Sequence, residues 1–347
     1  MREILLAPLA LLYRMAVSLR HKLFDCGLLK SEKFDIPIIC IGNITVGGTG
    51  KTPMSEMLID YMARTHRVAL LSRGYGRRTK GYVEVQPTAH YRDVGDEPLQ
   101  IKRKFPDTVV VVCEKRVEGI RRIREEHPEV NLIIMDDGFQ HRYVDPKINV
   151  LMVDSTRPIQ SDKMLPLGSL RDLPEQIYRA HYFVVTKCPE HMAPIERRIL
   201  RKVLIRYAYQ HIYYTRFESF TPQPIFPEDA SGEPIIQRRK VIALSGIGNP
   251  APFLRTLGEW YEVVAELTYK DHHVYRVSDM QRLASTLRQY PDAVIVTTEK
   301  DAVKLCRPER IPAEVRRALY YMPITISFIE DSATDFLQNL EADVRGN

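Results

Sequence analysis

The stretch that decides the fold is Gly42-Asn-Ile-Thr-Val-Gly-Gly-Thr-Gly-Lys-Thr-Pro53. It follows a short apolar run, residues 38–41, and opens a segment with a helical pattern, residues 52–65. Glycines at such a strand-to-helix turn let backbone N–H groups curl around phosphate oxygens, and the helix N-terminus adds partial positive charge. The context predicts a P-loop, in a variant form because the usual first glycine is Thr45.

The P-loop predicts a nucleotide site with a metal ion. Lys51 is expected to reach the β- and γ-phosphates, and the Thr52 hydroxyl is expected to ligate Mg²⁺. The phosphate-binding residues are expected to be Val46, Gly47, Gly48, Thr49, Gly50, Lys51 and Thr52. We therefore predict a phosphotransferase that uses a nucleoside triphosphate.

Apolar runs that are too short for helices follow on both sides of this stretch. They are rich in β-branched residues, which favours buried strands at 38–41, 68–71, 109–112, 132–135, 148–153 and 182–185. Segments 52–65 and 116–126 are long enough for crossover helices. The alternation predicts a parallel sheet with helices on both faces, the α/β/α arrangement of P-loop NTPases.

A change of composition predicts a second domain. Residues 220–234 are dense in proline and turn residues, which indicates a linker or an exposed crossing segment. Strand patterns then resume at 241–244, 263–267, 293–297 and 324–329. We predict an N-terminal helix over 1–30, a P-loop domain over 31–219, a linker over 220–235 and a smaller α/β domain over 236–347.

The N-terminus combines an apolar run with a basic amphipathic pattern. Residues 5–13 are almost wholly apolar but contain Pro8, and the run is far shorter than the roughly 20 residues that span a bilayer. It lacks a small-residue cleavage site, which excludes a secretory signal peptide. Residues 1–33 carry six Lys/Arg and three Asp/Glu, so the pattern fits either a helix lying on an anionic membrane or a helix packed on the core.

The overall composition sets broad limits on function. Of the 347 residues, 44% are hydrophobic and 27% are charged, which is ordinary for a soluble α/β protein. The net charge of +6 permits an anionic partner, but nothing in the sequence indicates nucleic acid or a protein partner. Five scattered cysteines without CxxC spacing argue against disulfides and zinc, and favour the reducing cytoplasm.

Paired acids follow the strand predicted at 132–135. Asp136 and Asp137 would then lie at the carboxyl edge of the sheet beside the P-loop, where they can hold magnesium directly or through water. Gln140 and His141 place further polar groups at the same edge, where α/β folds bind ligands.

Three smaller clusters leave alternatives open. Asp96 and Glu97 lie on a Gly/Pro-bounded turn, and a solvated turn is favoured over a catalytic carboxylate. The segment 73–77 offers Arg73 and Arg77 either for anionic headgroups or as an exposed basic turn. His272 stands beside an acid and a second histidine. Adjacent histidines face different ways, so a surface histidine is the default there.

Together these motifs resemble the tetraacyldisaccharide 4′-kinase family of lipid A biosynthesis. The resemblance runs in order through residues 42–53, 73–77, 95–98, 136–141, 165–173 and 271–272. It implies a cytoplasmic-face, inner-membrane enzyme that uses Mg²⁺-ATP to phosphorylate the 4′-hydroxyl of a lipid-linked glucosamine disaccharide 1-phosphate. It also implies two α/β/α domains, the smaller closing over the nucleotide, and a membrane-associating N-terminal helix.

The resemblance assigns roles to individual residues. It implies that Asp96 is the general base for the sugar hydroxyl and that His272 is its partner from the other domain. Arg116 matches a basic residue near the transferred phosphate, and Gln140 and His141 match neighbouring polar positions. Substrate-binding residues are then expected to be Arg73, Arg77, Gln140, His141 and Arg171. After Arg171 the family more often has Glu, where this chain has Asp172, and Ala-Gly-Pro is more usual after Pro166.

Two other classes share parts of this pattern. A membrane-associated ATPase that positions proteins carries a lysine immediately before the paired glycines, where this chain has Val46. A GTP-driven metal chaperone needs a Cys/His cluster and an Asn-Lys-x-Asp guanine-binding motif. The segment 186–189 lacks the final acid of that motif, and Thr298-Glu-Lys-Asp301 lacks the spacer.

Overall fold

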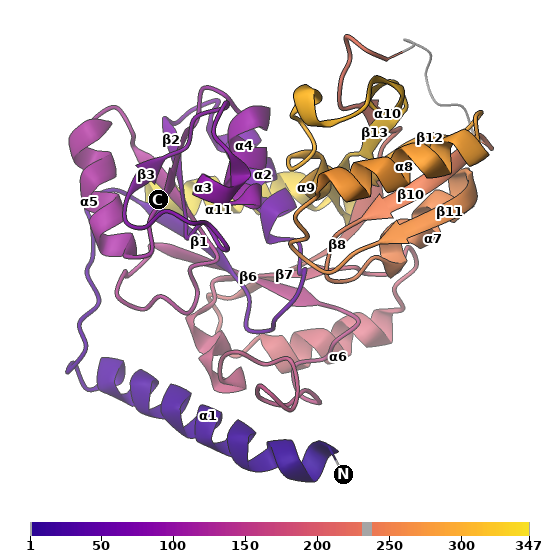
Figure 1. Ribbon diagram of the computed structural model, residues 1–347. Helices are drawn as coiled ribbons and strands as arrows, with labels where there is room; N and C mark the ends of the chain where they lie inside the picture. The colour runs from indigo at the N-terminus through magenta and orange to yellow at the C-terminus, as the bar shows by residue number, and fades with distance from the viewer. Residues whose placement is uncertain (1, 231–237, 347) are drawn as a thin grey trace.

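The computed structural model describes residues 2–230 and 238–346, which form two α/β units that lie side by side (Figure 1). Each unit is built around its own sheet, one of nine strands and one of five. The predicted α/β architecture with a larger and a smaller sheet is confirmed. Residues 231–235 of the predicted linker and 236–237 of the predicted smaller domain lie outside the described residues.

The larger sheet is mostly parallel, with an antiparallel pair at each edge. From edge to edge it runs β14 (Ile324–Phe328), β8 (His211–Ser219), β7 (Tyr182–Thr186), β6 (Ile148–Asp154), β1 (Ile38–Gly42), β5 (Leu132–Asp136), β2 (Val68–Ser72), β4 (Val109–Val112) and β3 (Val83–Glu84). Alternate residues of β1 face two separate cores, with Ile38 and Cys40 in one and Ile39 and Ile41 in the other. Both faces are therefore covered, as expected of a continuous apolar strand.

Helices cover both faces of this sheet. The first core packs against α1 (Arg2–Asp25), α5 (Arg116–Glu126) and α6 (Pro194–Leu204), and the second against α2 (Lys51–Met62), α4 (Asp96–Lys104) and α11 (Ala333–Arg345). Shorter helical turns are α3 (Tyr91–Val94), η1 (Pro174–Arg179) and η3 (Ile329–Asp331). None of the helices within residues 2–230 and 238–346 is long and apolar enough to cross a membrane.

The smaller sheet repeats the same layering on a smaller scale. Its strands run β11 (Glu262–Thr268), β10 (Lys240–Ser245), β12 (Val294–Thr298), β13 (Leu319–Met322) and β9 (Gln223–Pro224). Its helical segments are α7 (Ala251–Trp260), α8 (Val277–Gln289), α9 (Glu299–Ala302), η2 (Pro308–Arg310) and α10 (Ala313–Arg317). Leucines of α8 pack on one face of the sheet, and Leu257 of α7 packs on the other.

The end of the chain corrects the predicted smaller domain. The strand predicted at 324–329 was expected to extend the smaller sheet, but β14 pairs antiparallel with β8 in the larger one. The helix that follows also returns to the larger unit, where Phe336 is fully buried against Tyr182 and Tyr213. For residues 324–346 the prediction of membership in the smaller unit is wrong, because an apolar strand pattern does not indicate which sheet supplies the partner.

The predicted linker is also more structured than expected where it is described. Gln223 pairs with Tyr321 of β13, and Phe226 is buried in the core of the smaller sheet. The chain crosses between the units twice in adjacent antiparallel segments, joined by a hydrogen bond of 3.0 Å from Phe220 N to Pro323 O. Of the two predicted alternatives, the crossing segment is therefore confirmed where the chain is described, and a linker without its own packing is wrong for residues 220–230.

Candidate active site

The P-loop leaves the carboxyl end of β1, the central strand of the larger sheet, and leads into α2. Gly50 caps α2 at a φ of 89°, and a Cβ there would lie 2.6 Å from the Phe217 ring, so only glycine fits. Asn43 Nδ2 donates to Thr49 Oγ1 at 2.8 Å and braces the turn from within. The first N–H groups of α2 have no acceptors within the helix and can bind an anion.

The variant start of the loop has a structural explanation. Thr45 forms an antiparallel bridge with Leu170, and Val46 N donates to Ser169 O at 2.8 Å. An extended residue therefore replaces the expected glycine, because this part of the loop pairs with segment 165–171. Arg157, which the sequence analysis did not single out, donates to Val46 O at 3.4 Å and adds a guanidinium group beside the loop.

Asp136 ends β5 directly beside the P-loop strand, paired in register with Ile41. It is buried, its Oδ2 accepts from Ser72 Oγ at 3.3 Å, and its Oδ1 has no hydrogen-bond partner. Burial, together with the charges of Glu97 and Asp137, raises the pKa of Asp136 to about 7. A buried carboxylate oxygen without a donor fits a metal ion, which would supply the missing positive charge.

Asp137 is held by cations of the protein itself. Arg171 forms an ion pair with its carboxylate, with one N–O distance of 3.1 Å, and Lys51 Nζ lies 3.6 Å from Oδ1. Burial would raise the pKa of Asp137, but Lys51 and Arg171 lower it to about 2. The two predicted metal-binding acids thus differ: Asp136 keeps one oxygen, Oδ1, without a partner, whereas Asp137 positions Lys51 and Arg171.

Asp96 and His272 meet between the two units. Asp96 is the first residue of α4, and His272 lies in the loop between β11 and α8. His272 Nδ1 is 3.0 Å from Asp96 Oδ2 although the residues are 176 positions apart. Asp96 is only 5% exposed, so the alternative of a solvated turn is wrong for this residue. Burial would raise its pKa, but the hydrogen bond from His272 and the charges of Lys300 and Lys304 lower it to about 2.

Two lysines that the sequence analysis did not select support this pair. Lys304 is buried, with Nζ 2.9 Å from Asp301 Oδ1 and 3.8 Å from Asp96 Oδ2. Lys300 Nζ lies 3.2 Å from Glu97 Oε1. Both belong to the segment beginning with Thr298-Glu-Lys-Asp301, whose spacing does not match a guanine-binding motif. The sequence does contain an indication of their role, because an acid and two lysines follow directly after a buried strand.

The two arginines of the predicted basic loop after β2 differ in their exposure to solvent. Arg73 is exposed, but the Arg77 side chain is buried, 2.9 Å from Glu114 Oε2 and 2.5 Å from the Gly81 carbonyl oxygen. These bonds tie the loop to its surroundings and occupy the guanidinium group. The expectation of two free guanidinium groups for anionic headgroups is therefore wrong for Arg77.

The remaining predicted residues gather near the same edge. Gln140 Nε2 donates to Asn43 O at 2.8 Å, and buried Arg116 donates to the carbonyl oxygens of Cys113 and Asp136 at 2.8 and 3.3 Å. Burial, together with the charges of Arg116, Arg20 and Arg73, lowers the pKa of His141 to about 4. Guanidinium groups from three elements thus act on one half-buried imidazole. Arg20 belongs to α1 and was not predicted as a site residue.

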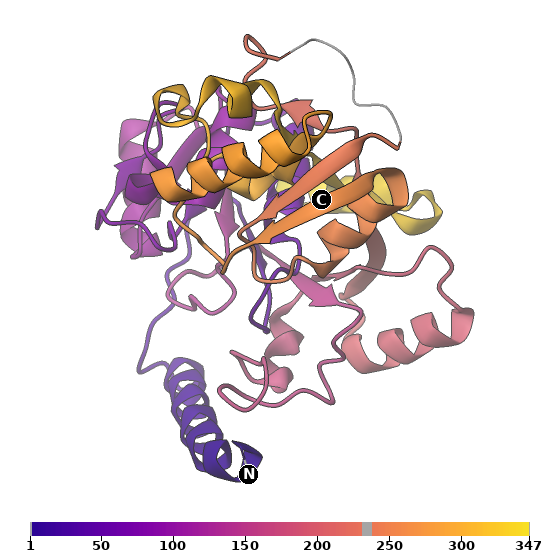
Figure 2. The same ribbon diagram turned by 45° about the vertical axis from the view of Figure 1, so that its right-hand side comes forward.

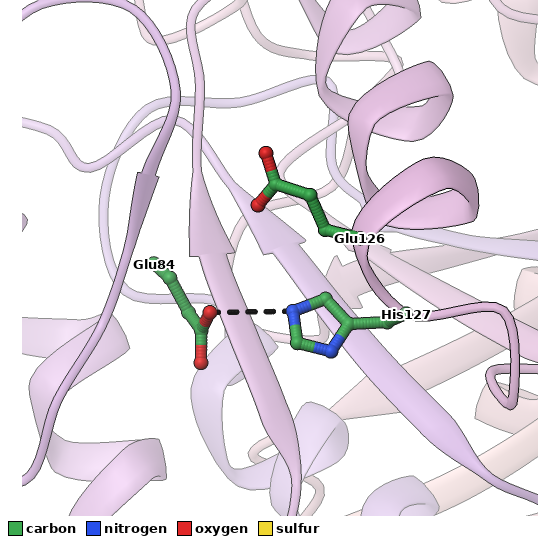
Figure 3. A group of neighbouring side chains, drawn as sticks. All are labelled: Glu84, Glu126 and His127. Carbon is green, nitrogen blue, oxygen red and sulfur yellow. Dashed lines mark hydrogen bonds and ion pairs between the residues drawn. The ribbon is translucent and has the colours of Figure 1, made fainter.

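Two further features lie away from this edge. Glu84, Glu126 and His127 form a cluster at β3 and the end of α5 (Figure 3), where His127 Nε2 is 3.2 Å from Glu84 Oε2. Arg122 already neutralises Glu126 at 2.5 Å. A hollow of about 860 Å³ is lined by Pro37, Lys147 and His181, which lie at the amino ends of strands of the larger sheet, whereas the P-loop follows a carboxyl end.

The fold and the site define a P-loop phosphotransferase. A P-loop lysine, a buried carboxylate with one unpartnered oxygen and an acid–histidine pair lie along adjoining elements, as phosphoryl transfer to a hydroxyl group requires.

Comparisons with known proteins identify the particular family. The family model for tetraacyldisaccharide-1-P 4′-kinase matches residues 2–343, so the chain belongs to this family. It is 39% identical to a tetraacyldisaccharide 4′-kinase of Phocaeicola vulgatus, covering 99% of this chain and 95% of the relative. It is 38% identical to one of Parabacteroides distasonis, covering 96% and 92%.

A solved structure agrees with this assignment. The LpxK structure from Aquifex aeolicus, in complex with ATP, superposes with a TM-score of 0.74 at 26% identity and covers 98% of this chain and 99% of that one. The chain is accordingly a kinase with an alcohol group as acceptor, and it carries out the ATP-dependent 4′-phosphorylation of a lipid A precursor.

Proposed function

We propose that this chain transfers the γ-phosphoryl group of ATP to the 4′-hydroxyl of a lipid-linked glucosamine disaccharide 1-phosphate, with Asp96 and His272 orienting that hydroxyl. The observation that carries the proposal is the 3.0 Å contact between His272 Nδ1 and Asp96 Oδ2 across the two units. Glu97 directly follows Asp96, and the charge of Glu97 raises the pKa of Asp136. The Asp96–His272 pair therefore adjoins the side of the P-loop where the metal ion is predicted.

Residues of the P-loop and its neighbours would neutralise the phosphates. Lys51, positioned by Asp137, would contact the β- and γ-phosphates, and Arg116 would add a second charge. Thr52 and Asp136, with Asp137 beside them, are the residues that would hold Mg²⁺, which neutralises charge on the phosphate oxygens when bound. The loose transition state of phosphoryl transfer makes such positioning and charge neutralisation the main contributions.

Asp96 is better suited to orient the hydroxyl than to remove its proton early. With a pKa of about 2 it is ionised at neutral pH and accepts a hydrogen bond readily, but it is a weak base. In a loose transition state the proton leaves late, so orientation matters more than base strength. Because the partners come from different units, closure of the smaller unit would assemble the pair and exclude water, which suppresses ATP hydrolysis.

The lipid substrate would approach along α1. Five large apolar residues of this helix are between 52% and 61% exposed, namely Leu9, Leu11, Leu12, Met15 and Leu19. The opposite side of α1 reaches the active-site edge, where Tyr13 OH donates to Arg171 O at 3.0 Å and His21 pairs with buried Asp172 at 2.6 Å. A helix anchored to the site and apolar on its outer face supports binding to a membrane surface, which we propose is the cytoplasmic face of the inner membrane. The sugar 1-phosphate would then be bound by Arg73, Arg171 and His141, together with Arg20.

A transfer assay tests this function. Purified protein is given γ-labelled ATP, Mg²⁺ and detergent-dispersed lipid A disaccharide 1-phosphate, beside a Lys51→Ala control. We expect label on the lipid, and a loss of about 10³-fold in the control because one preorganised cation is gone. Lipid-independent ATP hydrolysis without transfer would contradict the proposal and favour the membrane-positioning ATPase class.

A further inference from the structure

The helix α6 exposes apolar residues that its own fold does not use. Ile195 and Ile199 are four residues apart on one face of the helix and are 59% and 56% exposed. The opposite face supplies the packing: Leu204 is buried, and Leu200 and Val203 pack against the first core of the larger sheet. The two isoleucines are therefore not needed to hold the helix in place.

Cations flank these isoleucines on the outer side. Arg198, Arg201 and Lys202 are exposed, and among the described residues no carboxylate lies within ion-pair distance of them. The neighbouring Arg197 differs, because it forms an ion pair with Glu330 and lies over the Tyr214 ring. A short helix with isoleucines framed by free cations has the composition of an interfacial segment on an anionic bilayer.

The position of α6 in the fold agrees with this composition. Helices α1 and α6 pack against the same core and so cover the same face of the larger sheet. In both views they lie in the lower part of the molecule: α6 lies above the N-terminal end of α1 in Figure 1, and the two helices lie apart, α1 at the left and α6 at the right, in Figure 2. The exposed apolar side of α1 and the outer face of α6 are thus two contact points on one side of the protein.

We infer that the outer face of α6, formed by Ile195, Arg198, Ile199 and Lys202, is a second membrane contact for anionic phospholipid. A single amphipathic helix leaves a bound protein free to rotate about it, whereas two separated contacts fix its orientation. With both contacts made, the acceptor lipid meets the active-site edge in one orientation. This inference rests on the proposed membrane approach along α1, but it concerns a surface outside the active site.

Vesicle flotation of the full-length protein tests the inference. The vesicles contain equal parts of phosphatidylcholine and phosphatidylglycerol, and a second set contains phosphatidylcholine alone. We expect Ile195→Ser combined with Ile199→Ser to weaken binding to the anionic vesicles about tenfold. We expect Arg198→Glu combined with Lys202→Glu to weaken it about as much, and to change binding to phosphatidylcholine little.

Matched controls separate this contact from general surface effects. Val277 of α8 is 65% exposed and belongs to the smaller unit, so Val277→Ser removes exposed apolar surface elsewhere. Arg255→Glu combined with Arg282→Glu likewise reverses two exposed charges of that unit. Both controls should bind anionic vesicles as wild type does. Losses equal to those of the α6 variants would overturn the inference.

Activity measurements distinguish failure of this inference from failure of the proposed function. With detergent-dispersed substrate the α6 variants should turn over as wild type does, which also shows that they are folded. With substrate embedded in anionic vesicles they should be several-fold slower. Normal vesicle binding by both α6 variants would overturn the membrane contact. If these variants also differed from wild type in the molecular mass measured by light scattering, the outer face of α6 would be assigned to self-association instead.

Discussion

The P-loop and the Asp96–His272 pair are built in opposite ways. The P-loop lies within one strand–turn–helix segment, and its conformation depends on glycines at Gly47 and Gly50 and on the neighbouring strand β5. The pair brings together residues 176 positions apart, on different sheets that are joined by two adjacent chain crossings. The nucleotide site is therefore built within the larger unit, around one continuous segment, whereas alignment of the acceptor depends on how the two units meet.

The largest expected effect comes from breaking the pair while leaving the P-loop intact. Asp96→Asn keeps the shape of the side chain but removes the charge that orients the hydroxyl. We expect kcat to fall by about 10² to 10⁴-fold while ATP affinity changes little. The measurements are steady-state transfer to detergent-dispersed lipid and equilibrium binding of ATP.

A double-mutant cycle shows whether the two residues act as one unit. His272→Ala should also reduce kcat strongly, and the double variant should be little worse than Asp96→Asn alone. Independent, multiplying losses would mean that His272 acts separately from Asp96. Near-wild-type turnover in both single variants would remove the pair from the mechanism.

A second effect is expected in the pH dependence of stability. The pKa of Asp96 is about 2 in the folded protein against an ordinary value of 3.8, so the folded state binds this proton more weakly than the unfolded state. The ionised carboxylate should therefore contribute about 2 kcal/mol to the free energy of unfolding above about pH 4, and the contribution should vanish as the pH falls toward 2.

Urea unfolding of wild type and Asp96→Asn between neutral and acid pH measures this contribution. The stability difference between the two proteins should narrow only at acid pH. A difference that stays constant down to pH of about 3 would show that the contact with His272 and the lysines is not maintained in solution.

The smallest effect should come from a partly exposed ion pair between the units. Lys300 is 22% exposed and lies 3.2 Å from Glu97 Oε1, and such pairs contribute roughly 0–1 kcal/mol. We expect Lys300→Met to lower kcat/KM for the lipid by less than about tenfold and to leave ATP binding unchanged. The exposed Lys270, on the same loop as His272, provides a matched control as Lys270→Met. Equal losses in the two variants would assign the effect to net charge.

The same contrast explains which predictions succeeded. The strands at 38–41, 132–135 and 148–153 and the P-loop between strand and helix follow from periodicity and glycine spacing, and they are present. The burial and ion pairing of Arg77 and Asp96 could not be predicted from the spacing of motifs. Glu114 is 37 residues from Arg77, and the partners of Asp96 come from the other unit. Burial and pairing of a charged side chain depend on which distant groups surround it.

The sequence by itself determined the local chemistry: a phosphate-binding turn, two acids after a buried strand, and the order of motifs that indicated the family. These features depend on backbone conformations and side-chain periods that a few neighbouring residues specify. Only the tertiary structure decided that β14 and α11 return to the larger sheet, that Asp96 is buried against His272, and that α1 and α6 share one face. Those outcomes depend on long-range burial, which many alternative pairings of the same apolar segments could satisfy until the whole chain packs.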